Sequence, residues 1–236
     1  ERSVSAPSPG SSSTSTFTPP AVAVAASPSS LDLLVFSCSP ASSPLPAARE
    51  ELQQLQQLIR CSHVTSSGTA EMLRLSLLNT PPVWFLFSGH ADVQQPHARA
   101  AAATADVATP PPATLGFTTA EGTLSAVDPA QLASVVSSCR RLELVVLNGC
   151  CTSGLGHSLV DAGVPVVVCW RTRLADGAAR IFSVSLFHAL QRDDAKHAPD
   201  RYARAFAQAR AAVEFRENRD GRRVWQLRDP DTDLPV

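Results

Sequence analysis

Residues 144–156 of this 236-residue chain read LVVLNGCCTSGLG and contain the end of one predicted element and the start of another. The stretch opens on a continuous apolar run, which is typical of a strand buried on both faces of a parallel sheet. After Asn148 a glycine-bearing turn carries the chain into a predicted helix, which Gly163 should stop. Cys150 and Cys151 therefore lie between the end of a buried strand and the start of a helix.

The same alternation of strand and helix extends in both directions from this stretch. Apolar runs predict buried strands at residues 31–39, 82–90, 142–149 and 164–170. Helical spacing of apolar residues predicts helices at 47–60, 69–79, 128–141, 154–163, 175–191 and 199–215. A short extended piece is expected at 63–65, a hairpin at 115–126 and a last strand at 221–227. This order predicts an α/β fold with a mostly parallel sheet and helices on both faces.

Residues 1–30 differ in composition from the rest of the chain. They are Ser, Pro, Ala and Thr almost throughout, and such a stretch cannot bury enough apolar surface to offset its ordering entropy. We expect a disordered linker over 1–30, one folded domain over 31–228 and a short tail over 229–236. Because the chain begins with Glu1 and its only methionine is Met72, we also expect additional domains in a larger parent protein.

Charge and cysteine content limit the expected partners and compartment. A formal net charge of -1 at pH 7 indicates no basic surface, so we expect no nucleic acid and no membrane as partner. No apolar run reaches the roughly 18 residues of a membrane span. The six cysteines show no spacing typical of a zinc site, and several lie in strand-like runs. We therefore expect reduced thiols, an intracellular protein of the cytoplasm or nucleus, and no metal or other cofactor.

Two side chains with nucleophile and base chemistry follow predicted strands. His90 ends the run at 82–90, and Cys150 follows the run at 142–149. Binding sites of open parallel sheets lie outside the carboxyl ends of the strands, so both residues fall where a site is expected. The helix N-terminus after Cys150 would favour a thiolate and offer N–H groups to an oxyanion, while His90 could take the proton. The alternative is that Cys150 packs as a small apolar residue and His90 bonds to backbone, and spacing alone leaves both open.

Several segments, in the right order, resemble the CHAT domain family. LVVLNGCCTSGLG is similar to its nucleophile motif, and WFLFSGHAD, residues 84–92, is similar to its histidine strand. VDAGVPVVVCW, residues 160–170, resembles its Ala-Gly turn and strand leading to Trp, and DGAARIFSVSLFHAL, residues 176–190, resembles the helix that follows. That family belongs with caspases, gingipains and separases in one cysteine-peptidase clan. The resemblance implies a caspase-like three-layer sandwich and a cysteine endopeptidase that uses a Cys–His dyad and is regulated by other parts of a larger protein.

The resemblance assigns catalytic roles to individual residues. Cys150, directly after Gly149, matches the family nucleophile, and His90 matches the base. The backbone N–H groups of Cys150 and Ala91 match the oxyanion hole. Ala91 stands where the family has a glycine, so any left-handed backbone that this glycine adopts would be unfavourable here.

The resemblance also implies a substrate, a protein or peptide cleaved after a basic residue. Asp176 matches an acid that lines the pocket for an Arg or Lys side chain in separase-like members, and Trp170 and Asp92 are further candidate substrate-binding residues. Asp176 would alternatively cap its own helix, and Asp92 would alternatively be a surface-loop residue. Arg171 and Arg173 occupy a region where the family has an acid, and they would attract acidic residues instead.

Two other functions stay open at this point. One is a CHAT-fold protein-interaction or scaffold domain without turnover, which Ala91 after the histidine favours. The other is a flavodoxin-like or TIR-like nucleotide-binding domain, since the first strand and helix also suit those folds. GLGHSL, residues 154–159, is a poor phosphate loop, because it lacks both GxGxxG and the Walker lysine.

Overall fold

A five-stranded sheet forms the centre of the molecule in the computed structural model, which describes residues 32–64, 68–91, 114–119, 121–192 and 199–215. The strands follow the order β2-β1-β3-β6-β7, and all neighbours are parallel. They are β1 (Leu33–Cys38), β2 (Cys61–Val64), β3 (Trp84–Gly89), β6 (Leu144–Asn148) and β7 (Val166–Val168). The expected mostly parallel sheet is therefore confirmed. The linker 1–30, the tail 229–236 and the last strand 221–227 lie outside the described residues.

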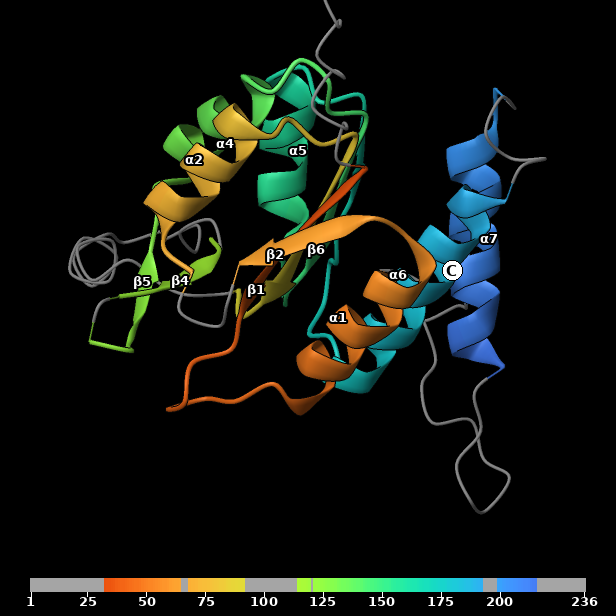
Figure 1. Ribbon diagram of the computed structural model, residues 1–236, viewed down its shortest axis with the longest axis horizontal. Helices are drawn as coiled ribbons and strands as arrows, with labels where there is room; N and C mark the ends of the chain where they lie inside the picture. The colour runs from red at the N-terminus through yellow and green to blue at the C-terminus, as the bar shows by residue number, and fades with distance from the viewer. Residues whose placement is uncertain (1–31, 65–67, 92–113, 120, 193–198, 216–236) are drawn as a thin grey trace, which may run out of the picture.

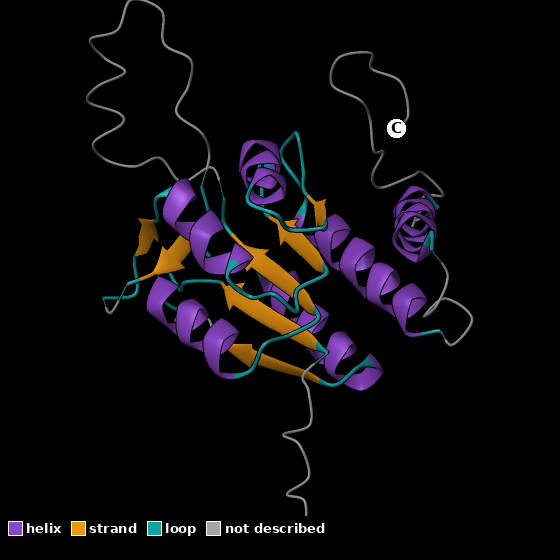
Figure 2. Cartoon of the chain, turned by 90° about the horizontal axis from the view of Figure 1, so that it is seen from above, coloured by secondary structure: helices purple, strands orange, loops and turns teal. Residues whose placement is uncertain are grey.

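Helices cover both faces of this sheet (Figures 1 and 2). Those in the described residues are α1 (Pro46–Leu58), α2 (Ala70–Asn79), α4 (Pro129–Ser137), α5 (Ser153–Asp161), α6 (Asp176–Gln191) and α7 (Arg201–Glu214). Helices α2, α4 and α5 lie on one face and α1 and α6 on the other, with α7 packed outside α6 (Figure 1). The predicted hairpin is β4 (Gly116–Thr118) paired antiparallel with β5 (Leu124–Ala126). Within the described part of the chain, no helix combines the length and apolar character that crossing a membrane requires.

Local sequence signals set the helix ends as predicted. The Asp128 carboxylate accepts hydrogen bonds from the backbone N–H groups of Ala130 and Gln131, at 2.8 and 3.0 Å, at the start of α4. Pro129 occupies the first turn, where its missing N–H costs nothing. Gly163 has a φ of +99°, a left-handed backbone that ends α5 and that glycine adopts without strain.

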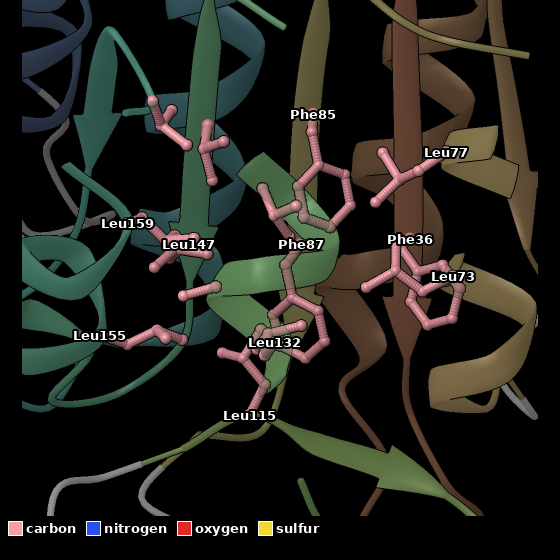
Figure 3. Close-up of a cluster of buried hydrophobic side chains, with 14 of the residues drawn as sticks. Phe36, Leu73, Leu77, Phe85, Phe87, Leu115, Leu132, Leu147, Leu155 and Leu159 are labelled. Carbon is pink, nitrogen blue, oxygen red and sulfur yellow. The ribbon is translucent and has the colours of Figure 1, made fainter. Parts of the chain in front are cut away.

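Two apolar cores hold the strands between the helix layers, because successive strand side chains point to opposite faces. On the α2, α4 and α5 side, Phe36, Phe85 and Phe87 are fully buried beneath the helices (Figure 3). The Phe87 ring centroid lies 5.9 Å from that of Phe117 in the hairpin. The core on the other face includes Leu86 and the large side chains of α6. Packing on both faces makes the sheet a rigid support for its strand ends.

Replacing Phe87 by alanine should destabilise the domain by about 3–5 kcal/mol, because the side chain is fully buried and its cavity would fill only in part. The matched control is Phe215→Ala, since Phe215 is 79% exposed and its loss should change stability by less than about 0.5 kcal/mol. Denaturant unfolding measures both changes. Equal losses in the two variants would contradict this account of the core.

Candidate active site

The strands that precede His90 and Cys150 are neighbours in the sheet. In the parallel pairing of β3 with β6, Ser88 lies opposite Asn148. His90 and Cys150 each come two residues after a member of this pair, so both leave the sheet at the same carboxyl edge. The sequence-based expectation that both residues lie at strand ends is met, and the sheet order adds that these ends are adjacent.

Two glycines allow the chain segments to approach closely as they leave the sheet. A Cβ built on Gly149 would lie 2.7 Å from the Ala91 Cβ and 3.1 Å from the Gly89 carbonyl oxygen. A Cβ built on Gly89 would lie 2.8 Å from the Phe87 ring. Only glycine therefore fits at residue 149 without displacing the segment that carries the histidine.

His90 is held at its ring and at its backbone. Its Nε2 lies 2.7 Å from the carbonyl oxygen of Ser43, in the loop before α1, and its own carbonyl oxygen accepts from the Gly116 N–H at 2.8 Å. A carbonyl oxygen only accepts, so in the neutral ring Nε2 carries the hydrogen and Nδ1 carries the lone pair. This contact is compatible both with a base held in one tautomer and with a strand-end histidine bonded to backbone.

The Cys150 sulfur is held against the segment that leads into α6. The Leu174 backbone N–H donates to Sγ at 3.4 Å, and Sγ lies 3.9 Å from the Leu174 carbonyl oxygen. The side chain is half-buried, so a substrate carbonyl would not have to open the core to meet it.

The segment after β7 holds the turn that carries Cys150, the candidate nucleophile. Cys151 has a φ of 54°, and its N–H donates to the Thr172 carbonyl oxygen at 3.1 Å. The Ser153 N–H donates to the Trp170 carbonyl oxygen at 3.1 Å, and the Trp170 N–H donates to the buried Thr152 hydroxyl at 3.0 Å. These bonds fix the turn between β6 and α5 while leaving Cys150 at its tip.

The expected oxyanion groups are the backbone N–H groups of Cys150 and Ala91. Neither has an acceptor among the described residues, whereas the Cys151 N–H is occupied by Thr172. Among the described non-glycine residues only Cys151 has a positive φ, so Ala91 adopts a backbone that suits alanine. The concern that this position requires glycine for its backbone angle is therefore removed.

A buried polar cluster, which the sequence patterns did not predict, lies behind the strand ends. Glu51 of α1 is 1% exposed and accepts from the Asn148 amide at 2.9 Å and from the Ser183 hydroxyl. The Asn148 oxygen accepts from the Trp170 indole N–H at 3.2 Å. Burial raises the pKa of Glu51, and hydrogen bonds from Ser183, Ser88 and Asn148 oppose that rise.

The signal that could have indicated this cluster is the helical face on which Glu51 lies. Ala48 and Leu55 are the other buried residues of α1, and they stand three residues before and four after Glu51. A carboxylate within an apolar stripe requires hydrogen-bond partners, because an unpaired buried charge is costly. The partners themselves come from other elements, so their identity was not visible in the spacing.

Asp176 is the first residue of α6, and its carboxylate bonds to another helix. Its Oδ2 accepts from the Ala47 N–H in the first turn of α1 at 2.8 Å. Ala175 is the N-cap of α6, so the alternative that Asp176 caps its own helix does not hold. Asp176 instead joins the N-termini of α1 and α6. Each of these helices directly follows a segment that contacts a candidate residue, Ser43 for His90 and Leu174 for Cys150.

The remaining substrate-binding candidates differ in position. Trp170 is half-buried, with its ring 5.2 Å from that of Phe182 in an edge-on arrangement of 73°. Arg171 and Arg173 are exposed in the segment between Trp170 and Leu174. Asp92 lies outside the described residues. Within the described part of the chain, no cluster of His, Cys, Asp and Glu could hold a metal ion.

The fold and this geometry define a caspase-like α/β domain with a cysteine and a histidine at adjacent strand ends. A family model of the CHAT domain matches residues 2–227. The chain belongs to the CHAT domain family, which is part of the caspase-like clan. A comparison with curated proteins found no match. The strand order is also that of flavodoxin-like folds, so topology alone did not exclude a nucleotide-binding domain, and the family match favours the caspase-like assignment.

In the folded protein, the cysteines should differ in the pH at which each reacts with an alkylating reagent. All six are free, and burial raises the pKa of Cys38 to about 12 and raises the pKa of Cys61, Cys139 and Cys169. Only about 1% of Cys38 would be thiolate two pH units below its pKa, so its labelling by iodoacetamide should stay slow up to about pH 10. Mass spectrometry of the labelled peptides measures this, with unfolded protein as control. Rapid labelling of Cys38 in the native protein at neutral pH would contradict it.

The left-handed backbone of Cys151 should make this position sensitive to side-chain shape. Cys151→Val should lower the free energy of unfolding by about 1–3 kcal/mol, because a β-branched residue is strained at positive φ. Cys151→Gly should remain within about 1 kcal/mol of the wild type, since relief of strain offsets the entropy of glycine. Thermal and denaturant unfolding compare the two variants directly. A valine variant as stable as the glycine variant would show that the turn is not constrained.

Proposed function

We propose that this chain is the peptidase domain of a cysteine endopeptidase, with Cys150 as nucleophile and His90 as general base. One observation carries the proposal. The paired strands β3 and β6 release these two residues at one edge of the sheet, where Gly149 lies against Ala91. Family membership supports the reaction class, because the clan consists of caspase-like cysteine peptidases.

In the proposed reaction, His90 Nδ1 takes the proton of the Cys150 thiol, and the thiolate attacks the carbonyl carbon of the scissile peptide. The oxyanion receives hydrogen bonds from the N–H groups of Cys150 and Ala91. The amine leaves with the proton held by His90, which produces a thioester at Cys150. Water, deprotonated by His90, then hydrolyses the thioester and restores the thiol.

The proposed specificity is for Arg or Lys on the acyl side of the scissile bond. Asp176 uses Oδ2 for Ala47, and its other oxygen could accept from a guanidinium or ammonium group. Trp170 and Asp92 would border the same pocket. A specific observation favours the opposite preference as a second candidate, because Arg171 and Arg173 are exposed beside the segment that contacts Cys150 and would attract an acidic side chain.

The proposed partners are a protein or peptide substrate and the further domains of a larger intracellular protein. The Leu174 N–H and carbonyl oxygen both contact Cys150 Sγ, so a shift of this segment would change the surroundings of the nucleophile. Movement of the segment before α6 by a neighbouring domain would therefore control the nucleophile. The same contacts also favour the competing function, a CHAT-fold scaffold in which the thiol is permanently held and no turnover occurs.

A panel of fluorogenic peptides with basic, acidic or apolar residues at the cleavage position tests the proposal. Cys150→Ala should reduce cleavage by at least about a thousandfold, while Cys151→Gly, the adjacent thiol, should retain it. Preference for the basic peptides supports the role of Asp176, and preference for the acidic peptides supports Arg171 and Arg173. Absence of any Cys150-dependent cleavage across the panel would reject the peptidase and leave the scaffold.

A further inference from the structure

A hollow with a volume of about 580 Å³ runs along β7, the last strand in the order of the sheet. All of β7 (Val166–Val168) lines it, together with the next residue, Cys169. Successive strand side chains point to opposite faces, so a hollow that touches all of them follows the edge of the strand. Leu186 of α6 and Phe206 of α7 form the opposite wall. We refer to this space as the β7 groove.

The groove combines backbone hydrogen-bonding groups with apolar side chains. Within the described residues β7 pairs with β6 alone, so the outer edge of β7 presents N–H and C=O groups that could bind a further strand. Phe206 is 38% exposed beside this edge, although its ring packs against that of Phe182 with a centroid distance of 5.6 Å. An extended segment with large apolar side chains on one face fits such a surface.

Residues 221–227, GRRVWQL, have this character, and they lie outside the described residues. In a strand, Trp225 and Leu227 share one face, and Val224 and Gln226 share the other. The family match extends to residue 227, past the end of α7 at Glu214, so the domain continues beyond its last described helix. The sequence therefore supplies a strand-like segment for which the described sheet has an open edge.

Helix α7 leads the chain toward this edge. It begins where the strands begin, because the Trp84 indole N–H donates to the Tyr202 hydroxyl at 3.3 Å and this hydroxyl donates to Glu143, just before β6, at 2.5 Å. From there α7 packs along α6 and runs in the same sense as the strands (Figure 1). Residues 215–220 span at most about 20 Å when extended, enough to turn back along a groove that α7 itself borders.

We propose that residues 221–227 occupy the β7 groove as a further strand, antiparallel to β7, with Trp225 and Leu227 against the wall formed by α6 and α7. The chain's own segment is favoured over a second copy or another protein, because its attachment to α7 gives it a high effective concentration at the groove. The proposal is independent of the Cys150–His90 dyad. Since the Trp170 N–H after β7 donates to Thr152 in the turn that carries Cys150, the added strand would also support that turn.

Disulfide formation with Cys169 tests the pairing in the full chain. Cys169 is free, lines the groove and lies just past the carboxyl end of β7, so an antiparallel strand brings its first half closest to it. Arg222→Cys or Val224→Cys should therefore form an intramolecular disulfide with Cys169 under mild oxidation. The control is Thr232→Cys in the tail, which should give at least about tenfold less of this bond. Peptide mass spectrometry of the unreduced monomer identifies the bonded pair.

Each other result of this experiment counts against the proposal. A disulfide to Cys169 between two chains would show that a second copy occupies the groove. No excess of the bond over Thr232→Cys would show that the segment lies elsewhere and leave the groove to another protein. A bond formed by Gln226→Cys in place of the two earlier positions would overturn the antiparallel direction.

Amide hydrogen exchange gives a second test that needs no new cysteine. Trp225→Asp places a charge in the apolar groove and should release the segment, so the outward β7 amides should exchange at least about tenfold faster than in the wild type. Leu234→Asp adds the same charge in the tail and should leave them unchanged. Protected β3 amides show that each variant is folded. Equal β7 exchange in the two folded variants would overturn the proposal, as would β7 protection in the wild type that disappears on dilution.

Discussion

The parallel pairing of β3 with β6 is the constraint on which the candidate site depends. Ser88 opposite Asn148 places the two following segments side by side, and the missing side chain of Gly149 lets them touch at Ala91. A register shift of one residue would turn each side chain to the opposite face and separate the histidine from the cysteine. Burial of the strands on both faces prevents that shift, because it would also displace the core.

Helix N-termini lie at the same edge, because β1, β6 and β7 are followed by α1, α5 and α6. Ser43 precedes α1 and accepts from His90, and Leu174 precedes α6 and donates to Cys150. The bond from the Ala47 N–H to Asp176 ties these two helix starts together. Partial positive charge at the helix N-termini would stabilise a developing oxyanion. The segments that contact His90 and Cys150 are thus linked to each other through the first turns of α1 and α6.

This arrangement buries several polar side chains behind the strand ends, and their desolvation costs free energy. Glu51, Asn148, Ser183 and Thr152 are all buried. Asn148 ends β6 and bonds to Glu51, Glu51 bonds to Ser183, and Thr152, in the turn that carries Cys150, bonds to the Leu147 carbonyl oxygen. An apolar cluster of similar volume would spare this desolvation cost. Directional hydrogen bonds, unlike apolar contacts, fix the orientation of the groups that they join, which suits a position behind the candidate nucleophile.

The sequence by itself determined the order of strands and helices along the chain and the parallel character of the sheet. It also determined that His90 and Cys150 follow buried strands. These follow from hydrophobic periodicity and from capping residues such as Asp128, which act locally. Only the tertiary structure decided that β3 and β6 are neighbours, that Asp176 bonds α1 instead of capping α6, and that Glu51 lies behind the site. Each of these depends on contacts between residues far apart in the chain, such as Glu51 with Asn148, and periodicity within one element carries no information about the partner across the sheet.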